Sequence, residues 1–149
     1  MNNDEKWMQI AIQEAIKASS EGEVPVGAVL VKDGELIAQA HNQPILKNDA
    51  SAHAEIQLLR IAGKKTKNYR LNNMTIYITL EPCIMCLGAI MNARISKIIY
   101  GAHDLKTGAC GSCINLNNSK CFQHRLIISG GILENKCKRL LQDFFKLRR

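Results

Sequence analysis

The chain has 149 residues, of which 46% are hydrophobic and 22% are charged, and its formal net charge is +7. This ordinary globular mixture excludes intrinsic disorder, and no run approaches the ~18 consecutive apolar residues that span a bilayer. We therefore expect a single domain over residues 1–149, without membrane contact, without a signal peptide at its start, and located in the cytoplasm.

Hydrophobic periodicity and turn residues divide the chain into helices and strands. In chain order, we expect a helix over 4–20, strands over 24–32 and 35–41, a helix over 53–62, a strand over 74–80, a helix over 82–92, a strand over 96–101, a loop over 103–121, a strand over 125–129 and a helix over 134–147. Asp33-Gly34 is typical of a tight hairpin turn, Gly63 should end the second helix, and Pro82 suits a first helical position. The order predicts a three-layer α/β/α sandwich with a central mixed five-stranded sheet.

Two of the six cysteines, Cys83 and Cys86, have the spacing that holds one metal ion. On a helix, residues i and i+3 share one face, and the positive N-terminal end of a helix favours thiolates in its first turn. In a reducing cytoplasm, such a pair indicates metal binding or catalysis rather than a disulfide. For this motif alone, a redox pair and half of a structural zinc site remain as alternatives.

His53 and Glu55 begin another predicted helix and complete the pattern. His53 adds a third ligand that zinc accepts, and three protein ligands leave the fourth tetrahedral position to water, as in catalytic zinc sites. Glu55 is the carboxylate suited to take a proton from that water. Taken singly, each is more often an ordinary core or surface residue. Together the motifs predict a catalytic zinc ion held by His53, Cys83 and Cys86, with Glu55 as the catalytic residue.

A second pair, Cys110 and Cys113, allows a rival site in which four cysteines hold a structural zinc ion. That site would leave His53 and Glu55 without a role. We therefore interpret Cys110, Cys113, Cys121 and Cys137 as free or core thiols.

Basic side chains are unevenly distributed along the chain. Residues 60–70 hold five Lys and Arg residues and no acidic one, and residues 134–149 are also strongly basic. This asymmetry is compatible with a polyanionic partner such as nucleic acid, and equally with a solvated surface and a basic tail.

The histidine and cysteine motifs resemble those of the cytidine/deoxycytidylate deaminase superfamily. The likeness to the bacterial tRNA-specific adenosine deaminases extends over nearly the whole chain, through residues 23–30, 41–42, 52–56, 81–86, 104–108, 130–133 and 143–149. The Asp-x-Lys-Thr-Gly segment and the Phe-Phe-Lys-x-Arg-Arg tail are more discriminating than the zinc motifs. His103, Cys110 and Cys113 depart from the common pattern, and none of them lies in the zinc motifs.

The resemblance implies a cytidine deaminase-like fold, one zinc ion per subunit, a homodimer, and hydrolysis of adenosine to inosine at wobble position 34 of a tRNA anticodon stem-loop. Zinc-activated water would attack the base while Glu55 shuttles the proton. Asn42 and the Ala54 backbone would contact the base, and Asp104 would contact a flanking ribose unless it caps its own loop. The tail and loop candidates for RNA contact are Lys106, Phe145, Arg148 and Arg149. The alternative is a deaminase of a free nucleobase or nucleoside such as cytosine, cytidine or guanine.

Overall fold

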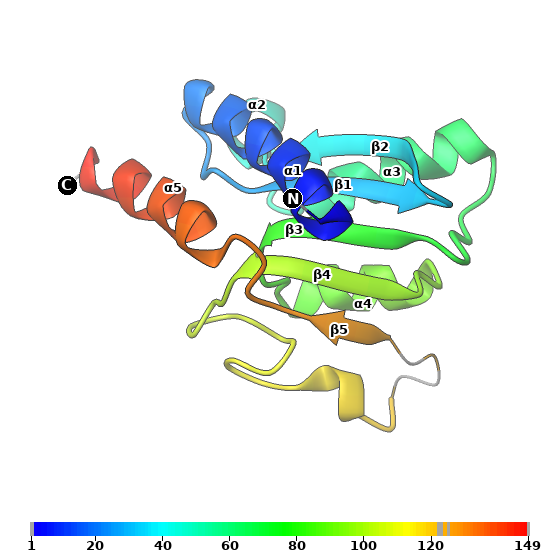
Figure 1. Cartoon of the computed structure of the whole chain (residues 1–149). Helices are drawn as coiled ribbons and strands as arrows, with labels where there is room; N and C mark the ends of the chain where they lie inside the picture. Colours follow the sequence, from blue (N-terminus) through cyan, green and yellow to red (C-terminus); the bar gives the residue numbers. More distant parts are fainter. Residues whose placement is uncertain (1, 122–123, 125, 149) are drawn as a thin grey trace.

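A computed structural model describes residues 2–121, 124 and 126–148 of the chain (Figure 1). Arg149, expected to contact RNA, lies outside the described residues. The elements are α1 Asn3–Ser20, β1 Gly27–Lys32, β2 Glu35–His41, α2 Pro44–Lys47, α3 Ala54–Thr66, β3 Thr75–Leu80, α4 Ile84–Asn92, β4 Lys97–Ala102, the 3-10 turn η1 Leu116–Asn118, β5 Ile127–Ser129 and α5 Glu134–Lys146. No helix within the described ranges is both long and apolar enough to cross a membrane.

In the described part of the chain, the sheet has five strands in the order β2-β1-β3-β4-β5. β1 pairs antiparallel with β2 and β3, while β3–β4 and β4–β5 are parallel pairs. The expected mixed sheet is therefore confirmed. The hairpin between β1 and β2 turns at Asp33 and Gly34, which have φ of 50° and 75°, as the preference of Asp-Gly for such turns predicts.

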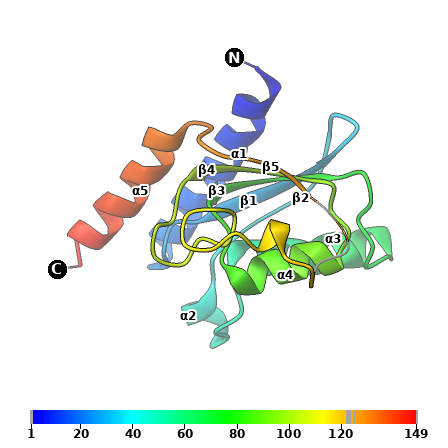
Figure 2. The same ribbon diagram turned by 90° about the horizontal axis from the view of Figure 1, so that it is seen from below.

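The strands are covered on both faces, which gives three layers (Figure 2). Because side chains alternate along a strand, Leu30, Ile76 and Ile98 pack in the core with α3 and α4. The intervening Val29 and Tyr77 pack in the opposite core with α1 and α5. α1 lies so close to β1 that a Cβ at Gly27 would overlap the Ala11 carbonyl oxygen. The predicted α/β/α sandwich is thus the observed architecture.

The differences from the expected elements include three boundaries and one additional helix. The first strand begins at Gly27 rather than residue 24, because Pro25 has no N–H for the ladder. α3 runs through Gly63 to Thr66, and Lys67 adopts the left-handed conformation that ends it. Pro82 lies outside α4, which begins at Ile84 after its N-cap residue Cys83. The short helix α2 was not expected.

The topology gathers several chain segments at one end of the strands, the edge of the sheet at which β3 and β4 finish. β3 and β4 are parallel, so the residues that follow them, from Glu81 and from His103, leave the sheet on the same side. β1 runs against β3 and β2 runs against β1, so the start of β1 and the end of β2, followed by Asn42, reach that side too. Open α/β sheets commonly bind ligands just beyond the carboxyl ends of their parallel strands.

Candidate metal centre and pocket

Two helix N-termini meet at this edge and bring three metal-ligand side chains together. His53 is the N-cap residue of α3, Cys83 is the N-cap residue of α4, and Cys86 lies in the first turn of α4. Their ligand atoms all lie within 4.8 Å of one another. The His53 Nδ1 atom is 3.7 Å from Cys83 Sγ and 3.5 Å from Cys86 Sγ. Of the residues that the structure describes, this is the one His/Cys/Asp/Glu group arranged to hold a metal ion.

These separations fit a zinc ion. Tetrahedral bonds of about 2.3 Å to sulfur and about 2.0–2.1 Å to nitrogen set the sulfur and nitrogen atoms about 3.5–3.6 Å apart, and the observed distances of 3.5 and 3.7 Å are close to this separation. Neither Cys110 nor Cys113 belongs to the group. The rival four-cysteine site is therefore not formed, and Cys110, Cys113, Cys121 and Cys137 are free, with Cys137 buried in the core.

The electrostatics of the three side chains favour a thiolate at Cys83. A hydrogen bond from Cys86, together with that from His53, lowers the pKa of Cys83 to about 4 despite its burial. The same contact with Cys83 raises the pKa of Cys86, with burial adding to it, and raises the pKa of the His53 imidazole. Because thiolates are the zinc-binding form of cysteine, the cluster already contains one ligand in that form.

Glu55 lies in the first turn of α3, two residues after His53, and is 4% exposed. Burial raises the pKa of Glu55 to about 7, and the negative charge at Cys83 acts in the same direction. A carboxylate with a pKa near neutrality can both accept and return a proton, as general acid–base catalysis requires. Glu55 is thus a buried titratable group directly beside the metal-ligand cluster.

A pocket of about 270 Å³ opens at the cluster. Its walls come from the sheet edge and from the segments that follow β2 and β4, and the lining residues are Val24, Val26, Asn42, Pro44, His53, Glu55, Leu80, Glu81, Cys83, Asp104 and Thr107. This size is at the small end for ligand sites. Perturbed titratable groups beside a small, mostly apolar cavity are typical of an active site.

Asn42 and the Ala54 backbone were both expected to contact the nucleobase of the substrate, but only Asn42 lies in the pocket wall. Asn42 lines the pocket, whereas Ala54 is fully buried behind it. The Ala54 backbone N–H donates to Asn42 Oδ1 at 2.7 Å. The amide nitrogen of Asn42 is therefore the end of this side chain that remains for a ligand.

A second hollow of about 510 Å³ shares Val24, Leu80, Asp104 and Thr107 with the pocket. It also includes Lys106 and Phe145, so the tail and the loop expected to bind RNA lie beside the pocket. Phe145 is 48% exposed. Arg148, in contrast, lies against its own helix, with its guanidinium 3.6 Å from the centre of the Phe144 ring.

The Asp104 carboxylate is turned toward its own loop. Its oxygens accept the backbone N–H groups of Lys106 and Thr107 at 3.1 Å and the Thr107 hydroxyl at 2.7 Å. This is the loop-capping arrangement that was the alternative to a ribose contact. Sequence reasoning missed Glu81, Pro44 and the valines of the pocket wall. Of these, Glu81 carried a signal, because it directly precedes the Pro82-Cys83 motif.

The sandwich fold and this donor set define a deaminase with the cytidine deaminase-like fold. The MafB19-like deaminase family matches residues 2–149, and the chain belongs to that family. A tRNA-specific adenosine deaminase of Haemophilus influenzae is 46% identical over 98% of this chain and 85% of its own.

Two solved structures are also similar to the chain. One is a tRNA:A34 deaminase of A-to-I editing at the wobble position of transfer RNA, with a TM-score of 0.89 and 40% identity over 91% of this chain and 99% of its own. The other is a guanine deaminase from Bacillus subtilis, with a TM-score of 0.65 and 40% identity over 69% of this chain and 66% of its own.

Proposed function

We propose that this protein hydrolyses adenosine to inosine at wobble position 34 of a tRNA anticodon. The observation that carries the proposal is the buried Glu55 carboxyl beside the His53, Cys83 and Cys86 cluster, at the base of a small pocket. The relatives named for adenosine deamination in tRNA, which match along nearly the whole chain, support the choice of substrate.

His53, Cys83 and Cys86 would hold zinc, which when bound supplies the Lewis acidity that lowers the pKa of water toward ~7. Glu55 accepts the proton of the attacking water and gives it to N1 of adenine as the C6–O bond forms. Glu55 then takes the remaining proton from the new C6 hydroxyl and gives it to the departing amine, so that C6 becomes a carbonyl and ammonia leaves. A pKa near 7 suits both directions of this transfer.

The pocket suits a single base taken out of its stack. Val24, Val26 and Leu80 offer apolar contacts to its faces, and the amide nitrogen of Asn42 offers a donor at one side. Extrusion of a base costs least in a single-stranded loop. An anticodon loop therefore fits the site better than a duplex does.

The hollow beside the pocket would take the neighbouring nucleotides. Phe145 presents a half-exposed ring on which a base can stack, and Lys106 adds a positive charge for a phosphate. Arg148 and Arg149 remain candidates for phosphate contact at the tail. For Asp104, we propose that it holds its loop rather than a ribose, because both of its oxygens accept hydrogen bonds from that loop.

Homodimer formation is the remaining part of this proposal. It is supported by large apolar side chains that are exposed on α2 and at the start of α4, namely Ile45 at 71%, Leu46 at 61% and Ile84 at 60%. Such side chains are often buried between subunits. Light scattering coupled to size-exclusion chromatography should give twice the mass of one chain.

A substrate panel tests the function. The protein is incubated with an anticodon stem-loop carrying adenosine 34, with free adenosine, with cytidine and with guanine, and the products are separated by chromatography. Inosine formed in the RNA alone supports the proposal. Product from a free nucleobase or nucleoside alone would instead establish the alternative, which the 40% identity to a guanine deaminase favours. Glu55→Gln protein is the inactive control.

A further inference from the structure

Two glutamates are almost completely buried beside the pocket without a cation to balance them. Glu23 is 1% exposed and Glu81 is 2% exposed, and neither forms an ion pair with any residue that the structure describes. Burying an unpaired carboxylate is costly unless hydrogen bonds replace its hydration. The burial of Glu23 and Glu81 therefore indicates that their carboxylates have a role other than core packing.

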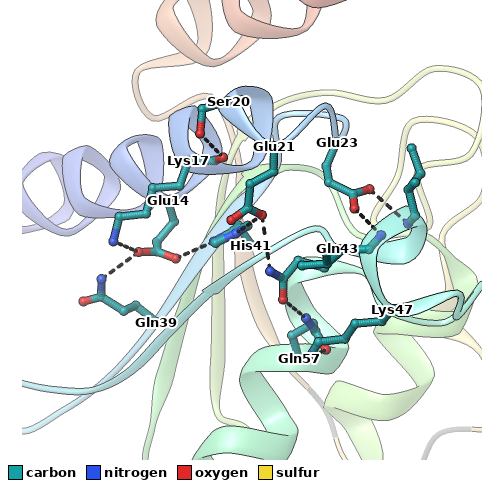
Figure 3. A network of polar contacts seen from close by, with 12 residues as sticks. Glu14, Lys17, Ser20, Glu21, Glu23, Gln39, His41, Gln43, Lys47 and Gln57 are labelled. Atoms are coloured by element: carbon teal, nitrogen blue, oxygen red, sulfur yellow. Dashed lines mark hydrogen bonds and ion pairs between the residues drawn. The ribbon is translucent and has the colours of Figure 1, made fainter.

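The Glu23 carboxylate holds the segment that follows β2. One oxygen accepts the backbone N–H of Ile45 at 3.2 Å, and the other accepts that of Leu46 at 2.8 Å (Figure 3). Both donors belong to the first turn of α2, where unpaired N–H groups need acceptors. Within one chain α2 buries none of its side chains, so its position relative to the rest of that chain depends mainly on polar contacts.

Further polar contacts hold the same segment from its other side. Gln57 of α3 donates to the Gln43 side chain at 2.7 Å and accepts a hydrogen bond from Lys47 at 3.0 Å (Figure 3). The segment carries Pro44 in the pocket wall and is flanked by Asn42 and His53, which also line the pocket. Glu23 thus fixes one wall through backbone groups.

The Glu81 carboxylate holds the opposite segment, which follows β4. It accepts the backbone N–H groups of Asp104 at 3.1 Å, Cys110 at 3.0 Å and Ser112 at 3.1 Å, and also the Ser112 hydroxyl. The chain passes so close that a Cβ at Gly108 would overlap this carboxylate. The segment carries Asp104 and Thr107 in the second wall.

We propose that Glu23 and Glu81 are positioning residues, each fixing one of the two loops between which the substrate base is held. The proposal rests on the proposed function, and it assigns to these side chains no contact with the reacting atoms. Each carboxylate is almost fully buried and accepts backbone N–H groups from one loop of the pocket wall. The hydrogen bonds of these two buried carboxylates therefore fix the positions of the two loops that form the pocket walls.

The test uses Glu23→Gln and Glu81→Gln in the zinc-loaded protein. In each case both carboxylate oxygens accept a backbone N–H. The NH₂ group of the substituted glutamine would therefore face one of these N–H donors, and that hydrogen bond would be lost. Hydrogen exchange followed by NMR should become faster at Ile45 and Leu46 in the first variant only. It should become faster at Cys110 and Ser112 in the second variant only. The matched control is Glu35→Gln, at the exposed start of β2.

Kinetics separate positioning from folding. With one zinc per chain retained, the single-turnover rate on the stem-loop should fall about 10- to 100-fold in both variants, as small misplacements of substrate do. RNA affinity, set mostly outside the pocket, should change by less than about threefold. If Glu81→Gln fails to fold, Ser112→Ala, which removes one donor to this carboxylate, should give the same local exchange and a smaller rate loss.

Three results would overturn the proposal. The first is unchanged exchange at the named amides, and the second is exchange that rises equally throughout the chain, which would indicate a general stability role. The third is local loosening without loss of rate. If the wild-type protein deaminates none of the substrates, the proposed function fails instead, and the exchange pattern still decides whether these carboxylates hold the two loops.

Discussion

The side-chain oxygen of Asn42 accepts the backbone N–H of Ala54 at a distance of 2.7 Å. This bond joins the residue after β2 to the first residue of α3, beside the metal-ligand cluster. It uses the only N–H that the Ala54 backbone could have offered to a base. It also orients the Asn42 amide so that its nitrogen is the group left for a ligand.

Two substitutions at Asn42 separate these roles. Asn42→Asp keeps the acceptor for Ala54 but removes the donor, so stability should stay near that of the wild type while kcat/KM falls. Asn42→Ala removes both and should also lower the free energy of unfolding by about 1 kcal/mol, as the loss of a helix cap does. Urea unfolding and steady-state kinetics on the stem-loop check this. Equal stability of the two variants would contradict the capping role.

The metal-ligand cluster could be predicted from sequence because each motif is local. Cys83 and Cys86 share one helix start, His53 and Glu55 share another, and the topology of the sheet brings the two starts together. The alternation of strands and helices along the chain likewise predicted the three-layer arrangement. Pro82 was wrongly expected inside the helix because the metal ligand Cys83, not the proline, forms the N-cap.

Asn42 and Asp104 of the pocket walls were expected near the substrate, but the way the walls are held in place could not be predicted, because distant side chains hold them. α2 has four residues and no buried side chain, and its N–H groups bond to Glu23, more than 20 positions away. The loop after β4 depends in the same way on Glu81. A local pattern carries no information about such partners, whereas the self-capping of Asp104 involves only near neighbours and was among the alternatives considered.

Glu55→Gln should leave zinc bound and remove catalysis. The amide has nearly the same shape but cannot accept and return a proton, so the single-turnover rate should fall by about 10² to 10⁴ or more. Metal analysis and product formation on the stem-loop are measured on the same sample. Loss of zinc together with activity would point to a structural role, and an active variant would exclude Glu55 as the proton shuttle.

Cys83→Ser should lose zinc, whereas Cys110→Ser should keep it. The Cys83 sulfur lies 3.7 Å from His53 Nδ1 and its pKa is low, near 4, so its loss removes the most available thiolate ligand. Cys110 lies outside the metal-ligand group, and burial raises its pKa to about 12. Zinc content after dialysis distinguishes them. Equal loss from both variants would revive the four-cysteine site.

Phe145→Ala should weaken RNA binding without affecting the metal centre. The ring is half-exposed over the hollow beside the pocket, and loss of a base–aromatic stack costs about 1–3 kcal/mol, or roughly 5- to 150-fold in affinity. Phe145→Tyr keeps the stacking surface and is the matched control. Binding is measured by fluorescence anisotropy with a labelled stem-loop. An Ala variant with wild-type affinity would remove Phe145 from the RNA contacts.

Acid should weaken the fold through Glu14, which joins α1 to β2. Burial alone would raise the pKa of Glu14, but hydrogen bonds from His41 at 2.9 Å, Lys17 at 2.8 Å and Gln39 at 2.7 Å lower it instead (Figure 3). Because the folded-state pKa lies below the ordinary value of 4.5, the stabilisation is present above that pH and is lost as pH falls through the folded-state pKa. Glu14→Gln should therefore lower the free energy of unfolding by about 1–3 kcal/mol at pH 5.5, and the difference should shrink as pH falls below 4.5 and through the folded-state pKa. Urea unfolding across this range checks it, with Glu35→Gln as the exposed control, and a difference independent of pH would contradict the assignment.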